Sequence, residues 1–199
     1  MTLPPSYFDD MYAASEDPWG FTHRWYERRK RALTLALLPD ERYAAAYEPG
    51  CSIGVLTREL ACRCDRVFAT DVAAAAVDAA RRACGDAPHV TITRAGVLDG
   101  WPDHALDLVV LSEVAYYFGP ADAERVAARA FAAGGTVVAV HWRHPVTDYP
   151  LGGDQVHAIL AEAAGHAQMS RLAQYADDDL LAEVWSANPQ SVATRAGLA

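Results

Sequence analysis

Short strand-like apolar runs alternate along the chain with longer segments of helical periodicity. The runs typical of buried strands lie at Tyr43–Tyr47, Arg66–Thr70, Val90–Thr93, Leu106–Leu111 and Thr136–His141. The segments between them predict helices at Val55–Cys64, Ala73–Cys84 and Ala121–Ala133, the last ended by Gly134 and Gly135. Short continuous strands between helices indicate a parallel sheet that is covered on both faces. We therefore expect a doubly wound α/β fold with Leu106–Leu111 as a central strand.

The two ends of the chain depart from this alternation. Near the C-terminus, Gln168–Tyr175 and Leu180–Trp185 predict two strands around an acidic turn, and hence a closing antiparallel hairpin. Before the first strand, Trp25–Leu38 predicts a helix with a basic face. The preceding segment, Tyr7–Trp19, is aromatic and irregular and could fold over a ligand as a lid. We expect one domain over residues 1–199, with residues 1–38 as its N-terminal lid and helical segment.

Composition and charge narrow the class of protein. The 199 residues are 52% hydrophobic, which is enough to bury a sizeable core. The formal net charge of −9 argues against nucleic-acid binding, which normally needs a basic face. The four cysteines lack zinc-site spacing and, without an export signal in Met1–Asp10, predict reduced thiols in the cytoplasm. No apolar run is long enough to cross a bilayer. We therefore expect no metal, nucleic-acid or membrane partner.

A turn with two glycines, Glu48–Gly54, joins the first predicted strand to the helix that follows. Strand, glycine turn and helix form a geometry in which backbone N–H groups approach a nucleotide-like ligand. Asp71 follows the next strand, where a carboxylate can accept two hydrogen bonds from a ribose diol. The alternative for Asp71 is a helix N-cap, a position that Asp favours. Together these features predict an adenosine-containing cofactor.

The glycine spacing separates two classes of cofactor. A dinucleotide pyrophosphate needs the pattern G-x-G-x-x-G, whereas here Gly50 and Gly54 are separated by three other residues. Glu48 is poorly placed for a pyrophosphate and would suit an ammonium group. S-adenosylmethionine carries an ammonium, a sulfonium and a ribose diol, and it has no phosphate. The sequence therefore favours S-adenosylmethionine, with S-adenosylhomocysteine as product, over a dinucleotide.

Several of these features follow one another in a fixed order along the chain. They are Glu48–Gly54, Asp71, Leu106–Leu111 with Ser112–Val114, and Gly134–Gly135. The ordered set resembles the class I S-adenosylmethionine-dependent methyltransferases. The resemblance is greatest to the nodulation-type (NodS-like) small-molecule N-methyltransferases, and there it extends to Asp17–Trp19, Tyr26–Arg28 and Ser112–Tyr117. It implies a seven-stranded Rossmann-like sheet with helices on both faces and the cofactor at the carboxyl ends of the first strands.

The resemblance also implies which residues surround the cofactor. They are Glu48, Gly50, Cys51, Gly54, Asp71, Val72, Val97 and Leu98. The glycine turn would line the methionine part, and Asp71 would hold the ribose. If the N-terminal segment folds over the cofactor, Trp19 would contact it, and Lys30 or Arg28 would meet the methionine carboxylate. The alternative is a helix whose basic face is solvated. Relatives normally direct an acid toward the adenine where this chain has Gly96. The backbone of Val97 and the side chain of Leu98 would then make the adenine contacts.

Residues after the fourth and fifth strands would lie near the transferred methyl group. Glu113 could attract a cationic amine, orient it or take its proton, and the alternative is a loop acid or helix cap. His141 is a candidate general base at neutral pH. The residues predicted to form the acceptor pocket are Tyr26, Tyr116, Tyr117 and His144. For the two adjacent tyrosines, ordinary core packing is an equal alternative.

We expect methyl transfer from S-adenosylmethionine to a small-molecule acceptor, foremost an amine such as an amino sugar. The expectation depends on the resemblance and on Glu113. Two alternatives stay open from the sequence. One is O-methylation of a small natural-product hydroxyl. The other is a non-catalytic cofactor-binding module, for which Gly96 is the one hint of a degraded site.

Overall fold

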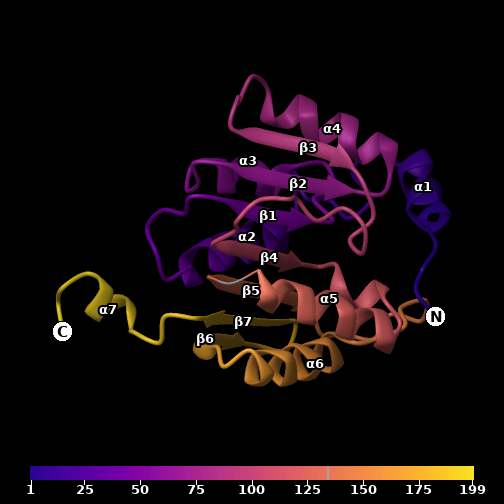
Figure 1. The fold of residues 1–199 in the computed structure, drawn as a ribbon. Coiled ribbons are helices and arrows are strands. Elements are labelled where there is room, and N and C mark those ends of the chain that lie inside the picture. The colour runs from indigo at the N-terminus through magenta and orange to yellow at the C-terminus, as the bar shows by residue number, and fades with distance from the viewer. Residues whose placement is uncertain (134) are drawn as a thin grey trace.

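Seven strands form one sheet in the computed structural model, which describes residues 1–133 and 135–199. They are β1 (Ala46–Pro49), β2 (Val67–Asp71), β3 (Val90–Arg94), β4 (Leu108–Ser112), β5 (Thr136–Trp142), β6 (Ser170–Ala176) and β7 (Leu180–Ser186). The order across the sheet is β3-β2-β1-β4-β5-β7-β6, with β1 to β5 parallel and β7 antiparallel to both of its neighbours. The predicted fold, with β4 at the centre and a closing hairpin, is confirmed (Figure 1). Gly134, predicted with Gly135 to end a helix, lies outside the described residues.

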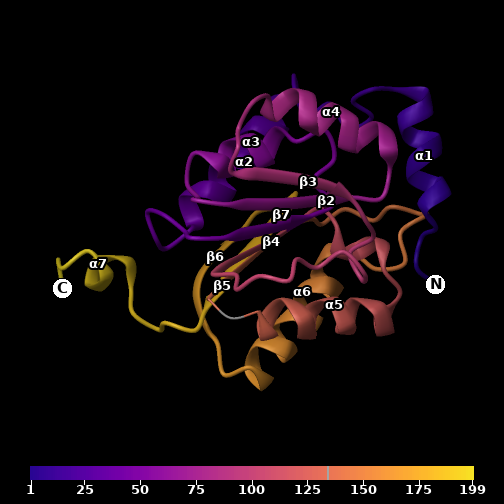
Figure 2. The same cartoon turned by 45° about the horizontal axis from the view of Figure 1, so that its top comes forward.

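Helices cover both faces of the sheet. The described helices are α1 (Pro5–Ala14), α2 (Trp25–Leu37), α3 (Val55–Ala61), α4 (Ala74–Cys84), α5 (Pro120–Ala132), α6 (Gly153–His166) and α7 (Val192–Arg195), with a 3₁₀ turn, η1, at Ala115–Tyr117. Figure 2 shows α2, α3 and α4 on one face and α5 and α6 on the other. None of the helices in the described ranges is long and apolar enough to span a membrane.

The central strand β4 contributes side chains to the hydrophobic core on both faces of the sheet. Leu108 and Val110 pack into a cluster that includes Leu60 of α3, whereas Val109 belongs to the cluster around Phe131 of α5. Successive strand side chains point to opposite faces, so a continuously apolar strand can supply both layers. The sheet is thereby fixed between two helical layers, and its strand ends form a rigid base for a binding site.

The first strand begins later than its apolar pattern predicts, at Ala46 and not at Tyr43. The carboxylate of Asp107 accepts the backbone N–H groups of Ala44 and Ala45, each at 2.8 Å, and so withdraws them from the sheet. The same aspartate stands just before β4 and marks the later start of that strand. The other predicted elements discussed above agree with the structure to within three residues at each end.

The N-terminal segment contains a helix where the sequence predicted irregular structure. Pro5 starts α1, a position at which its missing N–H group has no partner to lose. The backbone N–H of Leu3 donates to the carbonyl of Tyr117 at 2.9 Å. At the other side, the hydroxyls of Tyr12 and Ser52 lie 2.5 Å apart. The helix is therefore tied across the carboxyl ends of the strands (Figure 1).

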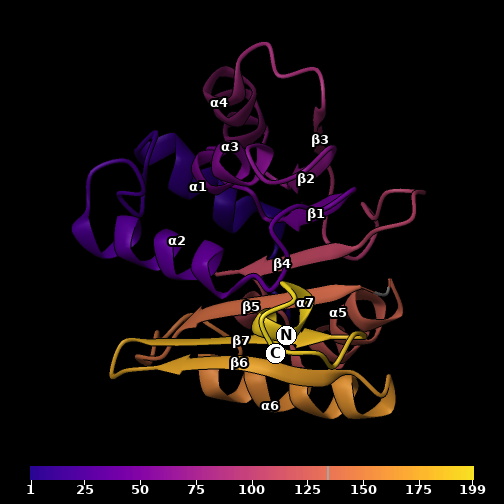
Figure 3. The same ribbon diagram turned by 90° about the vertical axis from the view of Figure 1, so that its left-hand side faces the viewer.

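The predicted C-terminal hairpin is present, and an aspartate organises its turn. The carboxylate of Asp177 accepts the backbone N–H groups of Asp179 and Leu180, at 3.0 and 2.8 Å. Figure 3 shows α6 running along β6 and β7. The hairpin thus extends the sheet beyond β5, and α6 covers one face of this part.

Candidate active site

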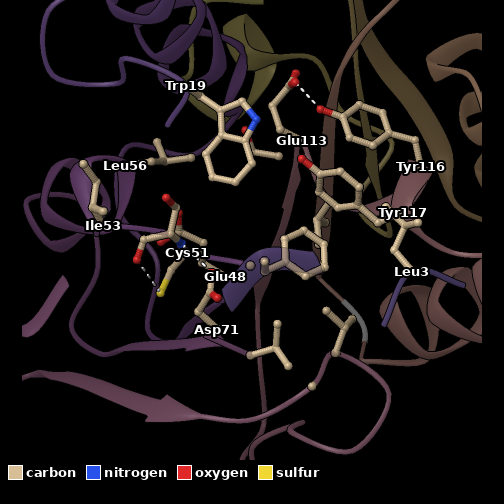
Figure 4. A pocket seen from close by; sticks show the side chains of 18 of the residues that line it. Leu3, Trp19, Glu48, Cys51, Ile53, Leu56, Asp71, Glu113, Tyr116 and Tyr117 are labelled. Carbon is tan, nitrogen blue, oxygen red and sulfur yellow. Dashed lines mark hydrogen bonds between the residues drawn. The ribbon is translucent and has the colours of Figure 1, made fainter. Parts of the chain in front are cut away.

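A cavity of about 300 Å³ lies at the carboxyl ends of β1 and β4, where the strand order reverses. Such switch points are the usual ligand sites of doubly wound sheets. The predicted site residues that line the cavity are Trp19, Lys30, Glu48, Gly50, Cys51, Asp71, Val72, Val97, Leu98, Glu113, Tyr116 and Tyr117. Figure 4 shows Glu48, Cys51 and Asp71 on one side and Glu113, Tyr116 and Tyr117 on the other.

Both glycines of the turn after β1 have positive φ angles that favour glycine. A Cβ on Gly50 would lie 2.7 Å from a methyl group of Val114. A Cβ on Gly54 would lie 2.8 Å from the backbone of Ala80 in α4. Gly50 lines the cavity, whereas Gly54 does not, so Gly54 acts at the helix packing behind the turn.

Glu48 is a buried acid without a cationic partner among the described residues. Its Oε2 accepts a hydrogen bond from the hydroxyl of Thr57 at 2.6 Å. Burial raises the pKa of Glu48 to about 8, because Thr57 only partly offsets the lost hydration. A buried carboxylate with no countercharge stabilises an incoming cation. Burial also raises the pKa of Cys51, which keeps that residue a neutral thiol.

Asp71 holds the turn together through both of its carboxylate oxygens. Oδ2 accepts the backbone N–H of Ser52 at 2.9 Å, and Oδ1 accepts that of Ala73 at 3.0 Å. Ala73, and not Asp71, is the N-cap residue of α4. Burial raises the pKa of Asp71 against these opposing hydrogen bonds. Each oxygen keeps a further lone pair, so the carboxylate can also accept the two hydroxyls of a diol.

The loop after β3 forms the far end of the cavity. Val72, Val97 and Leu98 line it, together with Gly96. A Cβ built on Gly96 would meet no atom within 4 Å, so this position leaves open space. Asp99 was not among the predicted site residues, but it also lines the cavity, three residues after Gly96, where an acid was expected.

A buried charge cluster connects α2 to the loop after β4. The Lys30 ammonium lies 2.9 Å from the Glu27 carboxylate and 3.6 Å from Oε1 of Glu113. Two carboxylates against one ammonium leave a net charge of about −1 when all are ionised. The predicted contact of Lys30 with the methionine carboxylate therefore competes with two acids already beside it. The adjacent Arg31 also lines the cavity, and its guanidinium bonds Glu59 and the carbonyl of Phe21.

Glu113 is held in a backbone conformation that is uncommon for a residue with a side chain, with a φ of 56°. Tyr116 donates a hydrogen bond to Oε2, while the buried Oε1 accepts none. Burial raises the pKa of Glu113, and Lys30 and Tyr116 oppose that shift. Ser52, also on the cavity, is likewise a non-glycine residue with positive φ. Such outliers persist where the surrounding structure determines them, as at functional sites.

Aromatic rings form the wall beside Glu113. Tyr116 stacks on Tyr149, with ring centroids 4.8 Å apart. Tyr117 meets Tyr116 edge-on at 4.8 Å and Phe8 of α1 at 4.9 Å. Trp19 also lines the cavity (Figure 4), and its ring packs edge-on against that of Tyr12 of α1, with centroids 5.7 Å apart. The N-terminal segment thus supplies part of the wall.

His141 does not reach the cavity, which corrects its prediction as a general base there. It is fully buried behind η1. Its Nε2 accepts the backbone N–H of Ala115 at 3.3 Å, and its Nδ1 lies 3.2 Å from Nε2 of His157. Neither ring nitrogen is open to a substrate. His157 of α6, its neighbour, is buried as well.

Two residues of the predicted acceptor pocket also lie outside the cavity lining. His144 is exposed and bonds Asp179 of the hairpin at 2.6 Å. Tyr26 packs edge-on against Trp142, with centroids 5.0 Å apart. His144 follows β5 and is bonded to the hairpin, whereas Tyr26 belongs to α2 and packs on the last residue of β5. The described residues hold no group of His, Cys, Asp or Glu side chains arranged to bind a metal ion.

Sequence reasoning missed lining residues that α1 and α2 contribute. Glu27 and Arg31 were missed, and they lie on one face of α2 with the predicted Lys30, at spacings of three and four residues. That spacing is readable in the sequence, but a charged helix face is usually solvated. Here the packing of α2 on the sheet directs this face into the cavity.

Comparisons with known proteins match this geometry. The family model of Nodulation protein S (NodS) matches residues 10–133. Nodulation protein S of Rhizobium tropici is 32% identical over 179 residues, covering 83% of this chain and 72% of the relative. A candidate methyltransferase of Pseudomonas syringae is 45% identical, with a TM-score of 0.69 over 82% of this chain and 99% of its own.

A further solved structure shares the fold. The N-methyltransferase NodS of Bradyrhizobium japonicum WM9, crystallised with S-adenosyl-L-homocysteine, has a TM-score of 0.78 and 24% identity. The match covers 94% of this chain and 99% of that one. Fold, cavity and relatives together define a class I S-adenosylmethionine-dependent methyltransferase. The chain belongs to the NodS family, because the family model matches more than half of it and the Rhizobium relative extends the match.

Proposed function

We propose that this enzyme transfers the methyl group of S-adenosylmethionine to the nitrogen of a small amine, such as an amino sugar. The observation that carries the proposal is the buried Oε1 of Glu113, which lines the cavity and accepts no hydrogen bond. Glu27 and Glu113 share the single ammonium of Lys30, so the cluster of these three residues has net negative charge when Glu113 is ionised. A cationic amine complements that charge, whereas a neutral hydroxyl does not.

The cofactor end fits the chemistry of S-adenosylmethionine. When bound, that cofactor supplies an electrophilic methyl group on a sulfonium. Glu48 would bind its ammonium, because this buried carboxylate has no other cation. Asp71 would accept the ribose hydroxyls. Arg31, which lines the cavity beside Lys30, would meet the carboxylate, because the Lys30 ammonium already has two acids beside it. Gly50 and Cys51 would line the methionine chain.

The adenine would lie between Val72 and the loop after β3. Leu98 would pack on the ring, and the backbone N–H of Val97 would donate to it. Asp99 would take over the contact with the adenine amino group that Gly96 lacks. This arrangement supports an intact cofactor site over a degraded one.

Glu113 would handle the proton of the acceptor. An amine reaches the cavity as an ammonium and must lose a proton before its nitrogen can form a bond to carbon. The Glu113 carboxylate would bind the ammonium and take that proton at Oε1. The acceptor would then be a neutral amine whose nitrogen carries a free lone pair. Tyr116 would hold Oε2 in place. Orientation of the two reactants can supply about 7–11 kcal/mol of the barrier reduction.

The N-terminal segment would exclude water from this reaction. Trp19, Phe8 and Tyr117 form an apolar wall over the acceptor side. We propose residues 1–38 as a lid that belongs to a single domain, supported by the contacts of Leu3 and Tyr12 with the two sides of the cavity. A cytoplasmic location is supported by the four free cysteines.

Sinefungin tests the position of Glu113 without a known acceptor. In this cofactor analogue, a carbon with an amino group replaces the methylsulfonium centre. We expect calorimetry to show sinefungin binding about tenfold more tightly than S-adenosylhomocysteine, as for a new charge-assisted hydrogen bond. Glu113→Gln should abolish the preference, and the matched surface variant Glu124→Gln should keep it. Equal preference in wild type and Glu113→Gln would place the methyl group elsewhere.

A matched pair of acceptors tests nitrogen against oxygen. Glucosamine and glucose differ by one amino group in place of a hydroxyl. Mass spectrometry after incubation with S-adenosylmethionine should show methylation of amino sugars from a panel led by glucosamine, and none of the hydroxyl counterparts. Methylated hydroxyls would establish O-methylation. Cofactor binding without product across the panel would support a non-catalytic module.

A further inference from the structure

A chain of hydrogen-bonded polar side chains, which we call the relay, runs behind the cavity from η1 to the edge strand β6. Its members are His141, His157, Glu183 and Arg171. His141 and His157 are linked at 3.2 Å, and His157 contacts Oε2 of Glu183 at 2.7 Å. Oε1 of Glu183 accepts a hydrogen bond from Arg171 at 2.6 Å. The two histidines and the glutamate are each at most 3% exposed. None of the four lines the cavity, and the proposed methyl transfer uses none of them directly.

The partners fix the direction of every hydrogen bond in this relay. The backbone N–H of Ala115 can only donate, so Nε2 of His141 carries no proton. The proton of His141 is then on Nδ1 and is donated to Nε2 of His157. Nδ1 of His157 in turn donates to the carboxylate of Glu183. Both imidazoles are therefore neutral and protonated on Nδ1.

The ionisation of the relay agrees with these directions. Burial, with help from the positive charge of Lys30, lowers the pKa of His141 well below its ordinary value, so that ring is neutral. Burial alone would raise the pKa of Glu183, but the hydrogen bonds from His157 and Arg171 outweigh burial and lower it. Glu183 therefore remains an anion, which favours a donor on the facing nitrogen of His157.

The fold brings the two histidines together through one close backbone approach. A Cβ on Gly153, the first residue of α6, would lie 2.3 Å from the carbonyl oxygen of Trp142 and 3.3 Å from the Cβ of His141. The absence of that Cβ lets the start of α6 approach β5. His157 lies one turn further along the helix and so reaches His141.

The relay ends on the turn that carries the acceptor-side residues. The N–H of Ala115, the first residue of η1, is held by His141. The Tyr116 ring packs edge-on against the His141 ring at 5.3 Å. The Tyr116 hydroxyl in turn donates to Glu113. A relay that ends on a backbone amide has no proton to give to a substrate, so its effect must be positional.

We propose that His141 is a positioning residue, held in one tautomer by His157, Glu183 and Arg171, that fixes η1 and thereby aims the Glu113 carboxylate. The inference depends on the proposed role of Glu113 at the methyl position. It gives a function to His141 and His157, which the cavity itself does not use. The arrangement is a general one, in which outer hydrogen bonds orient the groups that touch the substrate.

Two substitutions of His157 separate positioning from simple packing. The side-chain amide in His157→Gln can accept from His141 and donate to Glu183, whereas His157→Leu can do neither. We expect His157→Leu to lower the preference for sinefungin over S-adenosylhomocysteine by about threefold to tenfold, as for residues coupled through a shared network. Its affinity for S-adenosylhomocysteine should stay unchanged. His157→Gln should restore most of the preference. Unchanged preference in His157→Leu, or no rescue by His157→Gln, would overturn the proposal.

A double variant separates this proposal from the proposed function. If the relay acts through Glu113, His157→Leu should lower the affinity for sinefungin in the wild-type background and leave that affinity unchanged in a Glu113→Gln background. An equal loss of sinefungin affinity in both backgrounds would overturn the inference while leaving the role of Glu113 intact. Failure of the proposed function would instead appear in Glu113→Gln alone, as an unchanged preference.

The tautomer can be read in the wild-type protein, without any variant that must fold. Long-range ¹H–¹⁵N correlation spectra of the histidine rings distinguish a protonated from an unprotonated Nε2. We expect His141 and His157 to show the neutral form protonated on Nδ1, with S-adenosylhomocysteine bound. A proton on Nε2 of His141 would break its contact with Ala115 and contradict the relay.

Discussion

The two ends of the cavity are built in different ways. At the cofactor end, the carboxylate of Asp71 is held by two backbone N–H groups from residues close to it in the fold. At the acceptor end, Glu113 depends on side chains from α2 and η1, and one of its oxygens has no hydrogen-bond partner. The cofactor end is therefore preformed by local structure. The acceptor end is assembled by long-range packing and keeps unused capacity for a ligand.

The difference suggests how such a site can keep its cofactor and change its acceptor. A turn defined by glycines and one aspartate is specified by a few neighbouring residues. A cluster such as Glu27, Lys30 and Glu113 depends on how α2 is placed on the sheet. Substitutions in the two ends should then act on different measurable quantities.

Among the variants considered, Asp71→Ala should cause the largest loss of cofactor affinity. It removes the acceptor for the proposed ribose hydroxyls and two backbone bonds within the turn. At about 1.5 kcal/mol for each hydrogen bond to a charged group, we expect affinity for S-adenosylhomocysteine to fall by about 100-fold in calorimetry. The preference for sinefungin should persist, because Glu113 is untouched. Loss of that preference would mean that the two ends are not independent.

The charge of Glu48 should make cofactor binding depend on pH. With its pKa raised to about 8, Glu48 is mostly protonated below that pH in the empty enzyme. An ammonium binds the ionised form, whose fraction rises from about 1% at pH 6 to about half at pH 8, so affinity for S-adenosylhomocysteine should rise by roughly 50-fold over this range. Calorimetry across this range, with Glu48→Gln as the comparison, checks it. A pH-independent affinity in the wild type would remove Glu48 from the ammonium site.

Stability of the empty enzyme should change with pH in the opposite sense. The folded-state pKa of Glu48 lies above its ordinary value of 4.5, so the folded state binds the proton more tightly. Its contribution to the free energy of unfolding is full below pH 4.5 and is lost as pH rises through about 8. Glu48→Gln should flatten this part of the profile in thermal melts.

The smallest expected effect concerns the contact between α1 and the glycine turn after β1. Tyr12→Phe removes a hydroxyl that lies 2.5 Å from that of Ser52 and ties α1 to the glycine turn. We expect a loss of about 1 kcal/mol in the free energy of unfolding. Release of S-adenosylhomocysteine should become a few-fold faster in stopped-flow measurements. An unchanged release rate would show that α1 is a fixed wall and not a lid.

The sequence was most informative where neighbouring residues determine geometry. The glycine turn and Asp71 could be found because strand, turn and helix impose their own spacing. The alternating apolar runs predicted the sheet for the same reason. The start of β1 was missed because Asp107, far along the chain, takes two of its N–H groups.

The acceptor end was less predictable because it depends on contacts between distant residues. His141 has the residue type and the strand-end position of a base, yet α6 and β7 supply partners that bury it. Glu27 and Arg31 belong to a charged helix face of a kind that is usually solvated, and the packing of α2 on the sheet directs them into the cavity. Glu113 was found from its position after β4, but its free oxygen needed the structure.

The central claim is that Glu113 marks where the methyl group is transferred. A crystal structure of the sinefungin complex tests it most directly. If Glu113 faces the transferred methyl group, the amino nitrogen of sinefungin will lie within hydrogen-bond distance of Oε1 of Glu113, about 2.7–3.2 Å, with the ammonium of its amino acid part against Glu48. An amino nitrogen directed away from Glu113, with no contact to its carboxylate, would rule out this role for Glu113.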